Sequence, residues 1–284
     1  IHAVSGRGEA FKAGGRVVKN VTGYDLSKAM AGSWGTLAVV TDVTFKVLPA
    51  AETETTVAVR GLFDDGAAAA MALAMGSSAE VSAAAHLPEG ITARLAAGAL
   101  GRRSATVLRV EGFGPSVRAR VAMLRDLLAG AGAIEELPVE LSRHLWRDIR
   151  DCRPFADGSQ RPVWRLSLPP ADAHAMVMAL RMRAAAEVFY DWQGGLVWLS
   201  FEDEPETELV RGLVGTAGHA TLVRASPSVR ASVPAFHPQP PALAALAARL
   251  KAQFDPNGIL NPGRMATETA SGTLSPSQRE TVHD

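Results

Sequence analysis

Residues 14–49 read GGRVVKNVTGYDLSKAMAGSWGTLAVVTDVTFKVLP, and this stretch decides how the rest of the chain is interpreted. After a glycine pair and an extended segment, residues 24–31 have helical spacing, with Asp25 as the predicted N-cap. The Gly-Ser-Trp-Gly sequence at 32–35 ends that helix, and the β-branched run at 36–47 predicts a buried strand that Pro49 terminates. A glycine turn before a buried strand lets a backbone approach a ligand closely, but a plain helix–turn–strand corner fits the pattern equally well.

Two separated motifs resemble one flavoprotein family. The run KNVTGYDLSKAMAGSWGTLAVVTDVTFKVLP at 19–49 resembles the second half of the FAD-binding domain of the vanillyl-alcohol oxidase type, with the nearest likeness to the glycolate oxidase group of 2-hydroxy-acid oxidoreductases. FDPNGILNPGRM at 254–265 resembles the terminal signature of that family, where the chain returns to the FAD domain. The stretches LWRDIRD, VWRLSLPP and YDWQGGLVWLSF are more loosely similar to the FAD-binding, E-type subunit of bacterial glycolate oxidase.

The resemblance implies FAD as the cofactor and a set of residues around it. The residues expected to line its nucleotide portion are Gly32, Ser33, Gly35, Thr36 and the backbone of Val39, Val40 and Thr41. The residues expected to approach from the other side are Lys19, Asn20, Thr22 and Gly23. Asn261, held extended before a proline, either presents its amide near the flavin or merely caps a turn. Two positions depart from the family: Trp34 replaces a common acidic residue and Ala38 replaces a glycine.

The middle of the chain alternates between strand and helix patterns. Strands are expected at 52–60, 81–87, 105–111, 163–168, 187–190, 196–201 and 220–224, and helices at 64–75, 115–129, 141–149, 171–186 and 207–215. This order predicts an α+β domain, an antiparallel sheet with helices on one face, of the kind that forms the cap domain of FAD-linked oxidases. Asp64 and Asp65 are candidate caps of the helix at 64–75. No sequence repeat of fixed period is visible.

The domain organisation follows from these segments. Residues 1–50 are expected to be the C-terminal part of an FAD-binding domain, because the glycine-rich loop that binds the FAD pyrophosphate in the family is absent. Residues 51–233 form the cap domain, and 234–265 a proline-rich linker and an amphipathic helix that return to the FAD domain. Residues 266–284, rich in Ser, Thr and Glu, are expected to be disordered. The chain starts inside a predicted hairpin rather than at a methionine, which indicates a fragment.

Composition excludes several classes of function. The chain has 29 basic and 29 acidic residues, so no net field favours nucleic acid or an anionic membrane. Its single cysteine, Cys152, forms no internal disulfide or cysteine cluster for metal, and we expect it to be inert. No apolar run approaches the roughly 20 residues that span a bilayer. We therefore expect a cytoplasmic protein, and the family resemblance implies that it is peripheral at the inner membrane through a complex.

Catalytic residues are harder to identify. Trp146, Trp164, Trp192 and Trp198, with Arg165 and Asp191, either line a pocket on the flavin side or, as the more frequent role of tryptophan, pack the sheet. The histidines have no metal-ligand spacing. Catalytic relatives carry a histidine-containing Gly-Asp-Gly-Asn segment that this sequence lacks. Oxidation of a 2-hydroxy acid needs a base, and the sequence identifies none.

The resemblance therefore implies an FAD-binding subunit of a glycolate oxidase complex, an FAD-dependent oxidoreductase acting on 2-hydroxy acids. Its partners would be a catalytic flavin subunit and an iron–sulfur subunit, and the complex would oxidise glycolate to glyoxylate. Two alternatives stay open: a self-sufficient FAD-dependent 2-hydroxy-acid dehydrogenase, which a base in the pocket would support, and a flavin-free scaffold subunit of the same complex.

Overall fold

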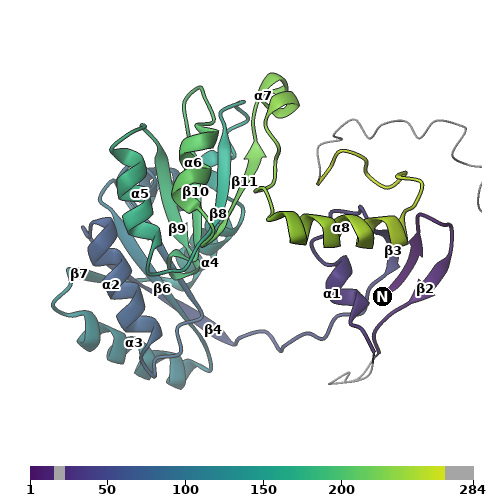
Figure 1. Cartoon of the computed structure of the whole chain (residues 1–284). Coiled ribbons are helices and arrows are strands. Elements are labelled where there is room, and N and C mark those ends of the chain that lie inside the picture. Colours follow the sequence, from purple (N-terminus) through teal and green to yellow (C-terminus); the bar gives the residue numbers. More distant parts are fainter. Residues whose placement is uncertain (16–22, 266–284) are drawn as a thin grey trace, which may run out of the picture. The chain divides into compact units, whose positions relative to one another are not determined.

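The computed structural model describes residues 1–15 and 23–265, which belong to two compact units (Figure 1). The first unit combines Ile1–Val47 with the C-terminal segment that starts at Pro238, and the second is Leu48–His237. The N-terminal and C-terminal motifs that resemble the FAD domain therefore fold together, although most of the chain separates them.

The first unit is built on a three-stranded antiparallel sheet in the order β2-β1-β3. Its strands are β1 (His2–Ser5), β2 (Ala10–Lys12) and β3 (Ala38–Asp42), and its helices are α1 (Leu26–Met30) and α8 (Pro241–Phe254). β1 and β2 form the predicted N-terminal hairpin. Asp25 caps α1 as predicted, because its Oδ1 accepts the N–H of Lys28 at 3.3 Å. The rings of Phe11 and Phe254 lie 5.9 Å apart, so α8 shares the small core of this sheet.

The strand predicted for residues 36–47 differs from the structure in length and burial. β3 covers only Ala38–Asp42, and Ala38 is its one buried residue. Val39 is 55% exposed and Phe45 is 78% exposed. The physical reason is that β3 pairs with β1 alone among the described strands, so it is an edge strand, and residues 43–47 continue without a ladder. Continuous β-branched sequence is thus not sufficient evidence of burial here.

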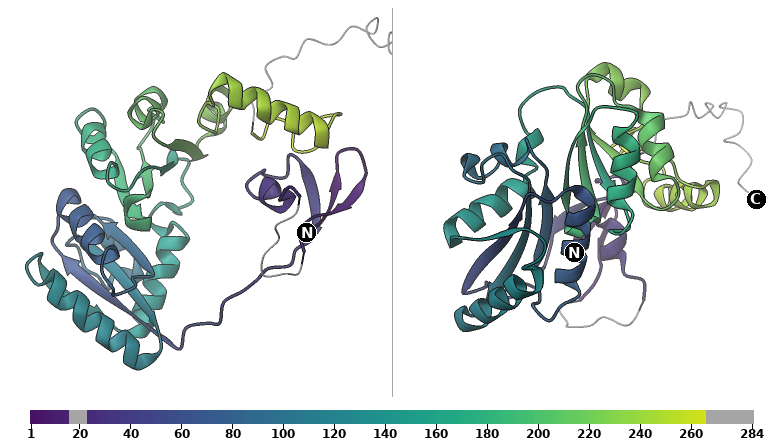
Figure 2. Two further views of the ribbon diagram at one scale, coloured as in Figure 1. Left: turned by 60° about the horizontal axis from the view of Figure 1, so that its bottom comes forward. Right: turned by 90° about the vertical axis from the view of Figure 1, so that its left-hand side faces the viewer.

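The second unit is an eight-stranded antiparallel sheet in the order β11-β8-β10-β9-β5-β6-β4-β7, which confirms the α+β class (Figures 1 and 2). Its first half consists of β4 (Thr53–Arg60), α2 (Asp64–Met75), β5 (Ala83–Leu87), β6 (Ala105–Gly112), α3 (Gly114–Leu128) and β7 (Ala133–Leu137). Its second half consists of β8 (Val163–Ser167), α5 (Ala173–Arg181), β9 (Glu187–Asp191), β10 (Leu196–Ser200), α6 (Thr207–Val214) and β11 (His219–Arg224). The halves are joined by α4 (Val139–Arg150), and α7 (Pro227–Ser232) follows the last strand.

Both halves have the same β-α-β-β-α-β topology. In each, the spatial order places the fourth strand beside the first, then the third, then the second. The two second strands, β5 and β9, meet antiparallel at a single pair, His86 with Tyr190. An antiparallel pairing of equivalent strands relates the halves by an approximate two-fold rotation. The unit is therefore an internal duplication in structure, although no sequence repeat reveals it.

Helices cover the two faces of this sheet unequally. Side chains of α2 and α3 pack in one core with β4, β5 and β6, and those of α5 and α6 pack in another with β8–β11. On the opposite face, α4 places Leu145, Trp146 and Ile149 over Ala58 and Ala85. Alanines of the strands thus make room for the large side chains of the helix. This packing fixes α4 against the first half of the sheet.

Some predicted details of the second unit were wrong. The residue at the N-cap of α2 is Phe63, and it makes no side-chain capping bond. Asp64 instead accepts hydrogen bonds from Tyr190 and Arg181, on the second half of the sheet. β7 was not predicted, and α5 ends at Arg181 rather than near residue 186. The predicted disordered tail lies outside the described residues.

Across residues 1–15 and 23–265, the structure contains no helix that combines the length and the apolar character needed to cross a bilayer.

Candidate functional site

The loop at residues 32–36 carries the first group of predicted cofactor residues. Gly32 and Gly35 have φ values of +79° and +69°, so the turn relies on the left-handed freedom of glycine. Ser33 and Thr36 are each only 8% exposed. The Thr36 hydroxyl donates to the Ser33 carbonyl at 2.7 Å. The Thr36 side chain therefore stabilises the loop from inside, and the outer surface consists of glycine backbone and the Trp34 side chain, which is 50% exposed.

Asn261, the predicted C-terminal contributor, lies against this loop, but its backbone is left-handed, with φ +43°, and not extended as predicted. Its Nδ2 donates to the carbonyl oxygen of Trp34 at 2.8 Å. A Cβ added at Gly35 would lie 2.9 Å from that Nδ2, so glycine is required for the close approach. The Arg264 guanidinium lies 4.9 Å from the centroid of the Trp34 ring. The structure thus brings together the two motifs that the sequence suggested belong to one site.

A buried ion pair holds the C-terminal segment in place. Asp255 is 2% exposed and forms an ion pair with Lys251, one helical turn earlier. The ammonium of Lys251 also donates to the carbonyls of Thr36 at 2.7 Å and Leu260 at 3.0 Å. Asp255 further accepts the N–H groups of Ile259 and Leu260. Burial alone would raise the pKa of Asp255, but these hydrogen bonds from Lys251, Leu260 and Ile259 hold it below its usual range.

Neither member of this ion pair was predicted as a site residue, because Asp-Pro-Asn-Gly at 255–258 indicates from sequence only the end of a helix and a turn. Their i, i+4 spacing at the end of the helix was the available signal.

The remaining predicted cofactor residues are spread along the unit. On β3, Val39 and Val40 are exposed, whereas the Thr41 hydroxyl donates to the His2 carbonyl at 3.3 Å. Gly23 has φ +75°, and a Cβ added there or at Gly32 would meet no atom within 4 Å. The predictions for Lys19, Asn20 and Thr22 fall outside the described residues. An open glycine backbone beside an exposed strand edge fits a nucleotide cofactor, since the backbone can be approached without side chains.

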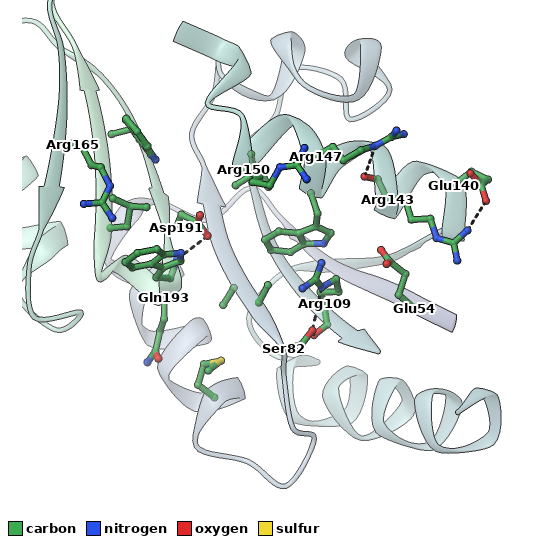
Figure 3. Close-up of a pocket in the computed structure, with 18 residues that line it drawn as sticks. Glu54, Ser82, Arg109, Glu140, Arg143, Arg147, Arg150, Arg165, Asp191 and Gln193 are labelled. Atoms are coloured by element: carbon green, nitrogen blue, oxygen red, sulfur yellow. Dashed lines mark hydrogen bonds and ion pairs between the residues drawn. The ribbon is translucent and has the colours of Figure 1, made fainter. Parts of the chain in front are cut away.

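The second unit carries a separate concavity of about 970 Å³, drawn in Figure 3. It lies between α4 and strands from both halves of the sheet. Five arginines and three carboxylates line it: Arg109, Arg143, Arg147, Arg150 and Arg165, with Glu54, Glu140 and Asp191. Its volume is in the range of small-molecule sites. The surplus of guanidinium groups favours an anionic ligand.

A chain of hydrogen bonds fixes the wall that α4 forms. The Trp146 indole donates to Thr56 Oγ1 at 2.8 Å, and Thr56 Oγ1 lies 2.7 Å from Ser142 Oγ. The Ser142 hydroxyl in turn donates to Glu54 at 2.8 Å. The guanidinium of Arg109 lies 5.4 Å from the centroid of the Trp146 ring. The side of α4 that lines the concavity and the neighbouring parts of β4 and β6 are therefore held in one arrangement.

The four tryptophans fill both roles that the sequence left open. Trp164 is fully buried and donates to the Pro205 carbonyl at 2.8 Å, so it packs the core. Trp192 lines the concavity and is 59% exposed. Trp146 and Trp198 have both roles, because each lines the concavity and also packs in the core under α4.

Asp191 and Arg165 lie in the concavity on neighbouring sides of Trp192. Asp191 Oδ1 accepts the backbone N–H of Trp192 at 2.8 Å. Burial raises the pKa of Asp191, and the Trp192 N–H and Arg109 oppose this only in part. The guanidinium of Arg165 lies 5.2 Å from the centroid of the Trp192 ring. A carboxyl with a raised pKa is a candidate general base. The sequence alone did not identify Asp191 in this role.

The described histidines lie apart from any group of metal ligands. His86 is 1% exposed, with Nδ1 at 3.0 Å from Thr106 Oγ1 and Nε2 at 3.5 Å from Asp64. His144 lies 3.6 Å from Asp148 on α4. Within the described ranges, no three or more side chains of His, Cys, Asp or Glu are grouped as metal ligands would be.

Comparisons with known proteins point to one family. No protein-family model matches the chain. The chain is 31% identical over 265 residues to glycolate oxidase subunit GlcE of Escherichia coli, a match that covers 93% of this chain and 64% of that protein. It is 39% identical over 56 residues to glycolate oxidase subunit GlcD of Bacillus subtilis, covering 20% of this chain and 12% of that protein.

Among solved structures, the chain is similar to 4-ethylphenol oxidase from Gulosibacter chungangensis, with a TM-score of 0.59 and 13% identity. That match covers 94% of this chain and 65% of the oxidase. At this identity the likeness concerns the fold alone. The chain thus spans less than two thirds of the length of these two relatives.

Proposed function

Because the chain is similar to glycolate oxidase subunit GlcE over 93% of its length and has the fold of FAD-linked oxidases of the vanillyl-alcohol oxidase type, we propose that it is an FAD-binding subunit of a glycolate oxidase complex. The observation that supports this most directly is the contact between the 32–36 loop and Asn261. It joins the two motifs that resemble the FAD domain at a turn with an open glycine backbone.

The residues proposed to hold FAD act mainly through the backbone. Gly32 leaves room for the cofactor and Gly35 leaves room for Asn261, while the bond from the Thr36 hydroxyl to the Ser33 carbonyl keeps the loop in shape. Val39, Val40 and Thr41 offer the edge of β3, Gly23 the other side of the site, and Asn261 the link to the C-terminal segment. Lys19, Asn20 and Thr22 keep the role that the family resemblance implies. When bound, FAD would accept a hydride from an alcohol carbon.

The proposed reaction is the oxidation of glycolate to glyoxylate by a complex. Glycolate oxidase subunits are among the relatives that match this chain, which supports an oxidoreductase acting on a 2-hydroxy acid. The proposed partners are a catalytic flavin subunit and an iron–sulfur subunit. Any association with the inner membrane would be peripheral and would occur through these partners.

One observation favours a second candidate, the self-sufficient 2-hydroxy-acid dehydrogenase. Asp191 supplies a carboxyl with a raised pKa in the same concavity as Arg109 and Arg165. A base of this kind beside a carboxylate-binding group is what such an enzyme needs. The measurement that separates the candidates is reduction of the flavin by glycolate in the absence of partners.

The proposal is tested by extracting and quantifying FAD from the purified full-length protein. We expect about one FAD per chain, lost in Gly35→Val, because a side chain there would displace Asn261. Gly8→Val is the matched control: Gly8 also has a left-handed φ, +79°, in the same unit, but its Cβ would meet no atom within 4 Å. A folded wild-type protein without flavin would contradict the proposal and favour the scaffold.

A further inference from the structure

The duplication of the sheet shows which position Arg165 occupies. In the first half, a row across the strands on the face covered by α4 is Ala85, Val107 and Ala58. Ala85 directly precedes His86, which pairs with Tyr190 at the centre of the duplication. The equivalent row in the second half therefore starts at Phe189, which directly precedes Tyr190, and continues through Trp198 to Arg165.

The two rows differ in what surrounds their residues at one end. Ala58, Ala85 and Val107 are fully buried in the core under α4. At the equivalent end of the second row, Arg165 and Trp198 instead line the concavity. Arg165 thus occupies the position in the second half that is equivalent to the buried Ala58 in the first half. The sheet does not need a guanidinium at this position to fold, because the first half has only the methyl group of Ala58 there.

Arg165 makes fewer polar contacts than the other arginines of the concavity. Arg109 lies 3.3 Å from Glu111, Arg143 lies 3.1 Å from Glu140, and Arg150 lies 2.8 Å from Asp151. Arg147 has no ion pair among the described residues, but its Nε donates to the Arg143 carbonyl at 3.3 Å. Within the described part of the chain, no carboxylate lies within 4 Å of the Arg165 guanidinium and no side-chain hydrogen bond satisfies it. The guanidinium lies over the ring of Trp192. A guanidinium presents five N–H donors, so most of its capacity is left for a ligand.

The turn that presents Trp192 has an unusual backbone. Trp192 and Gln193 have φ values of +52° and +62°, and Gly194 follows at +99°. Two successive non-glycine residues in the left-handed region cost free energy that the surrounding structure must offset. Asp191 fixes the start of the turn by accepting the Trp192 N–H. In Figure 3, Arg165 and Asp191 lie towards one end of the concavity, and Arg143 and Glu140 of α4 lie towards the other.

We propose that Arg165, Trp192 and Asp191 form a binding site for a 2-hydroxy carboxylate. Arg165 anchors the ligand's carboxylate, Trp192 holds the guanidinium plane from one side, and the Asp191 carboxyl receives the hydroxyl. A planar guanidinium matches a carboxylate through two parallel hydrogen bonds. The inference rests on the proposed function for the identity of the substrate, and it assigns the ligand's two polar groups to residues of this chain.

The test is calorimetric titration of the full-length protein with glycolate, with acetate and with glycolamide. We expect glycolate to bind, Arg165→Gln to weaken binding at least tenfold, and Arg165→Lys to give an intermediate loss because it keeps the charge without the paired donors. Glycolamide, which lacks the charge, and acetate, which lacks the hydroxyl, should each bind more weakly than glycolate. Circular dichroism checks that the variants fold.

Arg147→Gln is the matched control, because it removes an equal charge from the same concavity at α4. Equal loss of affinity in Arg147→Gln and Arg165→Gln would overturn the proposal in favour of a general field. Unchanged affinity in Arg165→Gln, or no glycolate binding by the wild-type protein, would also overturn it. Acetate binding as tightly as glycolate would refute the role of Asp191. FAD content, measured on the same samples, tests the proposed function independently.

Discussion

The side-chain amide of Asn261 donates a 2.8 Å hydrogen bond to the carbonyl of Trp34, 227 residues earlier in the chain. Asn261 has φ +43°, in the left-handed region where asparagine is among the best-tolerated non-glycine residues. Together with the approach of this amide to Gly35, this fixes the conformation of the 32–36 loop. A segment near the C-terminus thus completes the predicted cofactor loop.

Asn261→Ala should loosen that loop. Losing one hydrogen bond costs about 1 kcal/mol, which corresponds to a roughly fivefold increase in the population of the open loop. Hydrogen–deuterium exchange of the backbone amides at residues 33–36 measures this. Asn257→Ala, in the exposed turn just before, is the control and should leave exchange unchanged. Equal exchange in the two variants would show that the Asn261 contact does not hold the loop.

The ion pair between Lys251 and Asp255 should contribute more. Asp255→Asn removes the charged acceptor of several hydrogen bonds and should lower the free energy of unfolding of the first unit by about 2 kcal/mol. Glu140→Gln breaks an exposed pair with Arg143 on α4 and should cost less than about 0.5 kcal/mol. Urea denaturation measures both. Similar small losses would mean that the buried pair is not stabilising.

The same pair has a definite pH dependence. The folded pKa of Asp255 lies below its unfolded value of about 3.9, so its stabilisation is present above that value and is lost as the pH falls through the folded pKa. The difference in unfolding free energy between wild type and Asp255→Asn should therefore shrink on acidification. A difference that stays constant from neutral pH to pH 3 would contradict this assignment.

Asp64 should link the two halves of the large sheet. Burial would raise its pKa, but His86, Tyr190 and Arg181 together lower it from 3.8 to about 2. That shift corresponds to about 2 kcal/mol, present above the unfolded pKa near 4 and lost as the pH falls towards 2. Asp64→Asn should remove this amount in urea denaturation at pH 7, whereas Asp65→Asn, the exposed neighbour, should not. Equal losses of unfolding free energy in the two variants would show that the contacts of Asp64 do not stabilise the folded protein.

Cys152 should react slowly with thiol reagents in the folded protein. Burial raises the pKa of its thiol to about 12, against which Arg224 has only a small effect. Because the thiolate is the reactive form, labelling by iodoacetamide at pH 8 should be more than tenfold slower in the native than in the urea-unfolded protein. Equal rates in the two states would contradict this burial.

The elements of the second unit followed from the sequence because hydrophobic alternation is local. The helix at 64–75 and the strands around 105–111 and 196–201 were predicted within about a residue. β7 was missed because its two glutamates, Glu135 and Glu136, mask the pattern in an edge strand that pairs only with β4. The duplication was invisible, since the halves share strand order rather than residues. The row that ends in alanine in one half ends in arginine in the other.

The candidate sites depend on contacts that no local pattern encodes. The resemblance placed Gly35 and Asn261 in one site, and the structure brings them together. The role of Asp255 arises from the path of residues after α8, which a helix-stop signal does not describe. Asp191 was noticed beside Trp192, but its burial follows from its position at the end of β9 between strands of the sheet. Such burial is a tertiary property.

The most direct test of the account is the visible absorbance spectrum of the purified full-length protein, recorded without oxygen before and after glycolate is added together with the partner subunits. The account predicts an oxidised flavin spectrum that glycolate bleaches when the partners are present. A well-folded protein that shows no flavin absorbance would contradict it.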